Sequence, residues 1–141
     1  MPLLSHKGLL AIAAVIDVAL HAGSQPVAAK ALANRHRLPP RHLEPVLQAL
    51  VRQGVLKGIR GPRGGYQLGR DPRRITADDI LRAIGTVEDE HEGPGAKSNL
   101  LAHVVMPALA QAEAAFSSAL GRINIEDLMH AAQQQVQKSV A

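Results

Sequence analysis

The chain lacks cysteine and tryptophan altogether, and Tyr66 and Phe116 are its only aromatic residues. The absence of cysteine excludes disulfides, thiolate metal sites and cysteine nucleophiles. The scarcity of aromatic side chains argues against nucleic-acid modules that stack bases on aromatic platforms. Duplex DNA, which is recognised through charge and shape, needs no such platform. Apolar residues still make up 46% of the 141 residues, enough for a folded core.

A long hydrophobic run is also missing. The apolar stretch from Leu9 to Leu20 contains Asp17 and is too short to span a bilayer, and no typical signal-peptide cleavage pattern follows it. The Gly-x-Ser-x-Gly, phosphate-binding P-loop and His-Glu-x-x-His motifs are absent as well. We therefore expect a cytoplasmic protein that does not act on membranes and is not an enzyme.

Charge is divided unevenly along the chain. Residues 1–75 carry twelve Lys and Arg against three acidic residues, a net charge of +9, whereas residues 76–141 carry four against nine, a net charge of −5. A basic half joined to an acidic half indicates a phosphate-binding head attached to an assembly or sensor region.

Periodicity and capping residues predict a mainly helical head. A first helix runs from a Ser5 cap to about Ala22, a second short helix spans 27–36, and a third spans about 41–53. Pro45 is tolerated if regular helix begins close to His42, because the first turn has no intrahelical N–H partners. Two short helices joined by a tight Pro39-Pro40 turn are typical of a helix-turn-helix.

A glycine-rich hairpin follows. Strand-like runs at 55–60 and 66–70 flank the tip from Gly61 to Gly65, and a hairpin appended to a helix-turn-helix is a wing. Thr76–Asp79 resembles a capping box and opens a further helix that ends near Gly85. The expected fold is thus mainly α with a small β-hairpin wing.

Basic residues of this head form the predicted DNA-binding surface. The first turn of the third helix is expected to read base edges, the wing to reach phosphates or a minor groove, and further cations to hold the DNA backbone. The base-reading residues are Arg41, His42 and Glu44; those of the wing are Lys57, Arg60, Arg63, Gly64 and Gly65; those for the backbone are Lys30, Arg35 and Arg37.

The acidic half predicts a dimerisation helix. Residues 86–98 are expected to form a loop, 99–132 a long helix kinked at Pro107 and a short last helix capped by Asn124, and 133–141 a flexible tail; residues 1–85 form the winged head. An apolar stripe at spacings of three and four is typical of a helix–helix seam. The stripe consists of Leu101, Val105, Ala108, Ala112, Phe116, Ala119 and Ile123.

Several runs of residues resemble one family closely. These runs are Leu43–Leu47, Gly54–Leu56, Arg60–Leu68, Lys7-Gly8 and Asp17–Leu20. Over residues 3–85, and more loosely over 99–130, the chain is similar to the winged helix-turn-helix regulators that include IscR, NsrR and CymR. The resemblance implies a dimeric repressor or activator on an imperfect palindrome in double-stranded DNA. It also implies that Arg60 enters the minor groove and that His42 and Glu44 face the bases.

The cysteine residues that hold the cofactor in members of that family are missing from this sequence. Several members hold an iron–sulfur cluster with three cysteines before the long helix, but 87–101 contains none here. His103 matches a histidine ligand of one member, yet one imidazole cannot hold a thiolate-based cluster. We expect neither cofactor nor metal. The alternative is a hard-cation site formed by His91 and His103 with the acidic residues of 88–92. The competing interpretation of these residues is a solvated acidic loop that binds no metal.

A second hypothesis assigns the regulation of DNA binding to the acidic half of the chain. A small-molecule effector would bind between the long helix and the winged head, or a partner protein would dock there. In that case DNA binding would depend on the metabolite or the partner.

Overall fold

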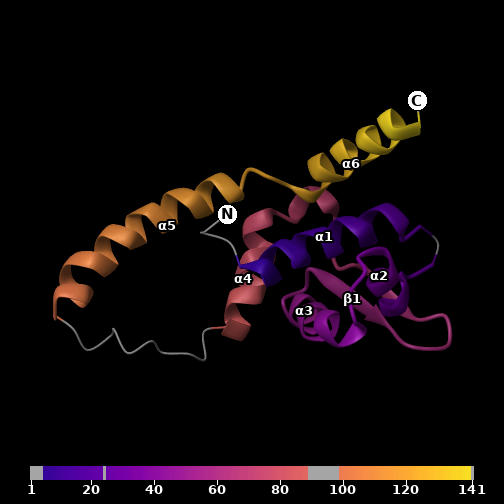
Figure 1. Ribbon diagram of the computed structural model, residues 1–141, viewed down its shortest axis with the longest axis horizontal. Helices are drawn as coiled ribbons and strands as arrows, with labels where there is room; N and C mark the ends of the chain where they lie inside the picture. Colours follow the sequence, from indigo (N-terminus) through magenta and orange to yellow (C-terminus); the bar gives the residue numbers. More distant parts are fainter. Residues whose placement is uncertain (1–4, 24, 89–98, 141) are drawn as a thin grey trace.

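The computed structural model describes residues 5–23, 25–88 and 99–140. They form several helices and one two-stranded antiparallel sheet, which lies at one side of the molecule (Figure 1). In chain order the elements are α1 (His6–His21), α2 (Ala29–Arg35), α3 (Pro40–Arg52), β1 (Leu56–Ile59), β2 (Gly65–Leu68), the 3-10 turn η1 (Pro72–Arg74), α4 (Ala77–Glu88), the π-helical turn η3 (Leu101–Val105), α5 (Met106–Leu120) and α6 (Ile125–Val140).

Three predicted helix starts are confirmed by their capping bonds. The Ser5 Oγ accepts a hydrogen bond of 3.0 Å from the Gly8 N–H at the start of α1. At α4, the Thr76 N–H donates to Asp79 Oδ2 and the Asp79 N–H donates to Thr76 Oγ1, each at 3.1 Å, which is a reciprocal capping box. At α6, the Asn124 Oδ1 accepts a hydrogen bond of 2.8 Å from the Asp127 N–H. These bonds satisfy N–H groups that a helix start leaves without partners.

The wing contains the predicted hairpin and one additional extended residue. β1 pairs with β2 from Leu56 opposite Leu68 to Ile59 opposite Gly65. Val27 forms an isolated bridge with Tyr66, through N–H···O bonds of 2.9 and 2.8 Å. The prediction that the second helix starts at Val27 is therefore wrong, because this residue is extended and α2 begins at Ala29.

α3 begins earlier than the sequence indicated. Its first residue is Pro40, so Pro45 lies inside the helix rather than in its first turn. A proline there removes the N–H that would bond to the Arg41 carbonyl. Buried Leu43, Leu47 and Leu50 on one face outweigh this loss, since each is fully enclosed.

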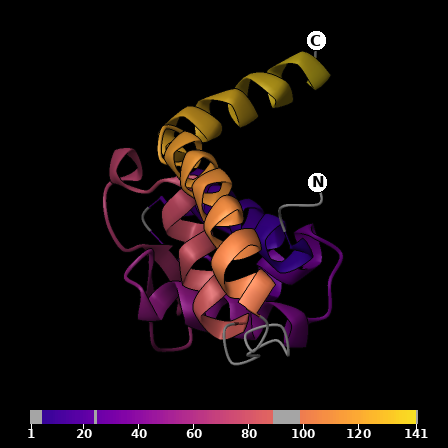
Figure 2. The same ribbon diagram turned by 90° about the vertical axis from the view of Figure 1, so that its left-hand side faces the viewer.

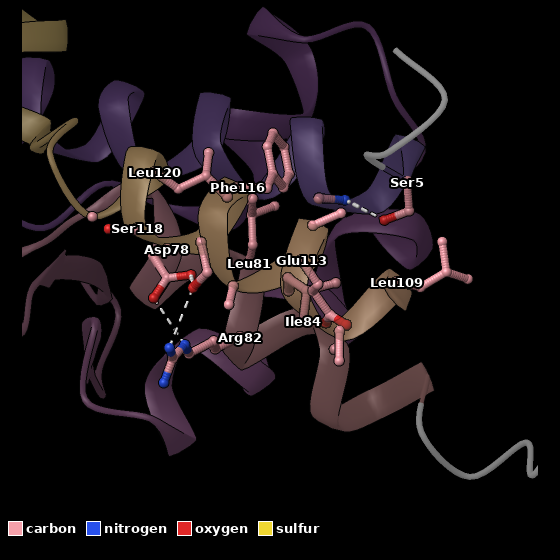
Figure 3. Close-up of a pocket in the computed structure, with 17 residues that line it drawn as sticks. Ser5, Asp78, Leu81, Arg82, Ile84, Leu109, Glu113, Phe116, Ser118 and Leu120 are labelled. Atoms are coloured by element: carbon pink, nitrogen blue, oxygen red, sulfur yellow. Dashed lines mark hydrogen bonds and ion pairs between the residues drawn. The ribbon is translucent and has the colours of Figure 1, made fainter. Parts of the chain in front are cut away.

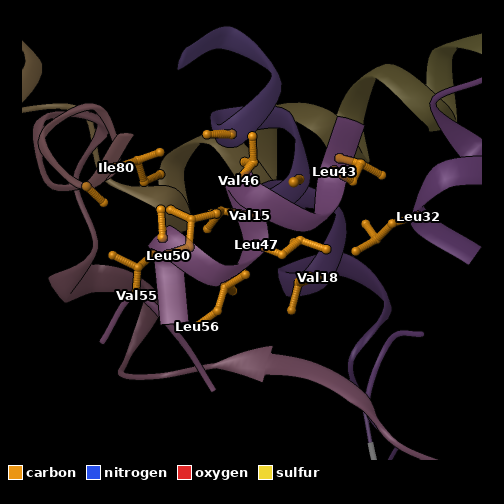
Figure 4. Packing of buried hydrophobic residues seen from close by; sticks show 14 of the residues in the cluster. Val15, Val18, Leu32, Leu43, Val46, Leu47, Leu50, Val55, Leu56 and Ile80 are labelled. Carbon is orange, nitrogen blue, oxygen red and sulfur yellow. The ribbon is translucent and has the colours of Figure 1, made fainter. Parts of the chain in front are cut away.

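One hydrophobic core joins the head to the last helix. Figure 4 shows Val15 and Val18 of α1 packed near Leu47 and Leu50 of α3. Ile125, at the start of α6, is fully buried in the same core. The chain re-enters the head through paired backbone segments, with the Ala77 N–H donating to the Ile123 carbonyl (2.8 Å) and the Ile125 N–H to that of Ile75 (2.9 Å). Segments that precede and follow α5 in the chain thus share one core.

The helices of the acidic half differ from prediction at two C-terminal ends and at the turn before Pro107. α4 continues to Glu88, so 86–88 are helical instead of part of a loop; the rest of that expected loop, with His91, lies outside the described residues. α6 continues to Val140, where a flexible tail was expected. Its alanine, glutamine and lysine residues have good helix propensity, which explains the extension. The kink expected at Pro107 takes the form of the π-helical turn just before it.

We call η3 and α5 together the stem. α5 has no buried residue, and Val104, Met106 and Leu109 are each more than half exposed. Figure 2 shows α5 crossing in front of α4, with α6 projecting beyond the head. Across the described ranges, no helix is long and apolar enough to cross a membrane.

Candidate nucleic-acid interface

The helix-turn-helix presents the predicted base-reading residues to solvent. Arg41, His42 and Glu44 are exposed in the first two turns of α3, while Leu43 and Val46 point into the core. α3 contacts both α2 and β1, so the wing and the two helices form one unit. This alternation leaves one polar side of α3 free to enter a groove of DNA.

The turn between α2 and α3 contains a strained residue. Arg37 has a φ of 53°, in the left-handed region that favours glycine. Its side chain is exposed. The chain therefore keeps an arginine at a position where glycine would be conformationally easier.

Three cations of the wing form no ion pair within the described ranges. Lys57, Arg60 and Arg63 are exposed, and none of them forms an ion pair with the residues described. Arg70 and Arg73 behave differently. Arg70 Nη2 lies 3.2 Å from Asp79 Oδ2, and Arg73 lies against Asp71 at 3.1 Å. The positive charge available for a ligand is thus concentrated toward the hairpin tip.

The two predicted wing glycines are required by packing. A Cβ atom on Gly64 would lie 2.3 Å from the Ile59 carbonyl oxygen, and one on Gly65 would lie 2.3 Å from that of Val27. Both distances are far below van der Waals contact. The glycines therefore keep the hairpin narrow and bring β2 against Val27, whatever the tip contacts.

Arg35 has a structural partner that sequence reasoning missed. Its Nε and Nη2 donate to the two carboxylate oxygens of Asp17 at 2.9 and 2.7 Å. The Asp17 side chain is 6% exposed, and His36 Nε2 lies 3.1 Å from its Oδ2. This bidentate pair connects α2 to α1. Arg35 therefore orients the helix-turn-helix against α1, and its guanidinium is not free to bind DNA. An acidic residue inside the apolar run of α1 was the available signal.

The histidines beside Asp17 must present N–H groups to it. An ionised carboxylate only accepts hydrogen bonds, so His36 donates through Nε2. His21 Nδ1 donates to the Asp17 carbonyl oxygen at 2.9 Å and lies 3.3 Å from Oδ1. Burial by itself would raise the pKa of Asp17, but the hydrogen bond and charge of Arg35, with His21 and His36, lower it below its ordinary value.

We expect Asp17→Asn to lower the free energy of unfolding by about 1–3 kcal/mol at pH 7, because the buried carboxylate charge and one of the two oxygens that accept from Arg35 are lost. A carboxyl with a depressed pKa stabilises the folded state above its unfolded pKa and ceases to do so as the pH falls through the folded value. The difference between wild type and variant should therefore shrink below about pH 4. Urea unfolding at pH 7 and pH 3 measures it.

Glu44→Gln is the matched control, since it removes an exposed carboxylate that has no described ion pair. Its effect should stay within about 0.5 kcal/mol. Equal midpoints for Asp17→Asn and wild type at pH 7 would contradict the structural role given to Asp17.

Comparison with known proteins agrees with this arrangement. The family model Rrf2, described as "Iron-dependent Transcriptional regulator", matches residues 4–131. The chain therefore belongs to the Rrf2 family of winged-helix transcriptional regulators, which are not enzymes.

Individual relatives share most of the chain. The HTH-type transcriptional regulator IscR of Xenorhabdus nematophila is 32% identical over 131 residues, covering 89% of this chain and 78% of the relative. Among solved structures, T. potens IscR has a TM-score of 0.72 at 29% identity, covering 94% of this chain and 89% of that one. CymR, the global cysteine regulator of B. subtilis, has a TM-score of 0.67 at 28% identity, with coverages of 91% and 96%.

The iron chemistry implied by the family description does not fit the donors of this chain. An iron–sulfur cluster needs thiolate ligands, and the sequence has no cysteine. His103 lies exposed in η3, and no group of three His, Cys, Asp or Glu side chains that could hold a metal occurs in the described part of the chain.

Proposed function

We propose that this regulator binds double-stranded DNA as a homodimer, in the cytoplasm, and represses or activates transcription from an operator with two related half-sites. α3 would lie in the major groove with Arg41, His42 and Glu44 toward the bases. Arg60 and Arg63 of the wing would reach the adjacent minor groove or its phosphates, with Lys57, Lys30 and Arg37 on the backbone. The observation that carries this proposal is the set of exposed cations on α3 and the wing that form no ion pair with the residues described.

The stem supports the homodimer. Two apolar hollows adjoin it: a cavity of about 1320 Å³ toward α4, lined in part by Ala112 and Phe116 (Figure 3), and one of about 340 Å³ lined in part by Phe116, Ala119 and Ile123. The first exceeds the 300–1,000 Å³ of ordinary ligand sites and is open. The occupant that matches the length and the apolar lining of this cavity is the stem of a second copy of the chain. Val105 and Ala108 continue this face; the Leu101 side chain is outside the described set.

Without cluster ligands, we propose that control does not use an iron–sulfur centre. The alternative is control by a small molecule or a partner protein that occupies the same cavity. Asp78, Arg82 and Glu113 at its wall would supply polar contacts. A labelled promoter fragment titrated with pure protein, with and without cell extract, discriminates the two: binding only in the presence of extract favours the alternative.

The central test is a salt titration of DNA binding. Each phosphate neutralised on duplex DNA contributes about −0.9 to the slope of log K against log salt concentration, so two heads should give a slope of several units. Fluorescence anisotropy with a labelled duplex between 50 and 300 mM salt measures this slope. The proposal would be overturned if the purified protein bound no duplex at low salt, either alone or with cell extract added.

A further inference from the structure

Three polar side chains connect the head to the stem. Ser117 Oγ of α5 donates to Asp78 Oδ1 at 2.5 Å and accepts from Arg82 Nη2 at 3.3 Å. Arg82 Nε in turn lies 2.8 Å from Asp78 Oδ2, with Asp78 only 16% exposed. We call Asp78, Arg82 and Ser117 the α4–α5 clamp; Figure 3 shows the Asp78–Arg82 pair beside α5. One hydroxyl thus bridges two α4 side chains that are already paired with each other.

The clamp lies near the C-terminal end of α5, where this helix contacts α4. On the C-terminal side of Ser117, the stem is fixed by the backbone bonds at Ile123 and Ile125. On its N-terminal side, Leu109 and Glu113 of α5 line the same open cavity as Leu81 and Ile84 of α4. The orientation of the N-terminal part of α5 is therefore fixed by the clamp and by the backbone bonds that follow α5.

A small rotation at this point has a large effect at the far end of the stem. Met106 to Ser117 spans roughly 16 Å at 1.5 Å per residue. A rotation of about 10° would move the Met106 end by about 3 Å, close to the 3.4 Å spacing of base pairs. In a dimer that is joined through its stems, the same rotation occurs in both protomers.

We propose that Ser117 is a positioning residue for DNA recognition. By fixing the angle between α4 and α5, it sets the distance between the two α3 helices of the dimer, and hence the half-site spacing that the dimer prefers. This inference rests on the homodimer of the proposed function. In this proposal the half-site spacing depends on the hydroxyl group of Ser117, which lies outside the surface that would contact DNA.

The lack of cysteine makes a direct distance measurement simple. Arg52→Cys, at the exposed C-terminal end of α3, gives one spin-label site per protomer. Double electron–electron resonance on the full-length labelled dimer then reports the distance between the two heads. In the Ser117→Ala background we expect the distance distribution to broaden and its mean to move by about 3 Å or more, as the lever estimate gives. Arg82→Ala should act in the same way, since its 74% exposed side chain is not part of the core.

Gln111→Ala is the control, because it truncates an exposed side chain of α5 that lies outside both the clamp and the lining of the cavity, and it should leave the distances unchanged. A parallel selection of bound duplexes from a random pool should show an altered half-site spacing only for the clamp variants. Unchanged distances and unchanged spacing in both clamp variants would overturn the inference. A labelled Arg52→Cys sample with an intact clamp that gives no dipolar signal would instead refute the homodimer itself.

Discussion

Ala112→Glu in the stem is expected to convert the dimer into a monomer and to weaken binding to a two-half-site operator by about 10²–10⁴-fold, because the second head no longer binds at high effective concentration. Ala112 is exposed in the described chain and belongs to the predicted stripe. The substitution therefore leaves the core of the head intact, while it would place a carboxylate in an apolar helix–helix contact without a partner. Sedimentation equilibrium and DNA titration measure the two effects.

Gln111→Glu is the control, because it adds the same charge to the neighbouring exposed residue, about 100° around the helix from Ala112. This variant should remain dimeric and bind with nearly wild-type affinity. If Ala112→Glu also remains dimeric at micromolar concentration, the stripe is not the interface.

Arg60→Ala is expected to reduce affinity for the operator by about 1–3 kcal/mol, and to reduce the salt slope by about one per protomer. The physical reason is that Arg60 is an exposed wing cation without a described acidic partner, so its charge is available to DNA. Anisotropy titrations at several salt concentrations give both quantities.

Arg73→Ala provides the comparison for Arg60. Arg73 is 72% exposed and lies close to the wing in sequence, but Asp71 and Glu126 already neutralise it, at 3.1 and 3.7 Å. Its removal should change affinity little. Equal salt slopes for Arg60→Ala and wild type would place Arg60 outside the contact surface.

The sequence predicted the local features of the head well. Ser5, Thr76 and Asp79 form caps that depend only on near neighbours, and the hairpin follows from its glycine-rich tip. The apolar periodicity of α3 also identified the buried Leu43 and Leu47. Such features are encoded within a few residues and can be read without knowing the tertiary fold.

Contacts between distant segments were not predictable in this way. Arg35 looked like a backbone-binding cation because Asp17, its partner, lies 18 residues earlier on another helix. Ser117 gave no signal, since its bonds to α4 depend on how the stem leaves the head. Val27 followed a helix-starting Pro26 but pairs with Tyr66 across the wing. In each case a long-range partner decided the outcome, and local propensity is only a weak guide there.

The burial of Ile125 beside Ile75 and Ile80 has a consequence for how the molecule can change. The polypeptide leaves the head after α4 and returns to it before α6, so the intervening stem is an excursion anchored at both ends. A cut at either end would expose apolar surface that the returning helix now covers. Within α5, however, substitutions outside the apolar stripe and the α4–α5 clamp can occur without disturbing the core of the head, provided that the two anchoring points keep their spacing.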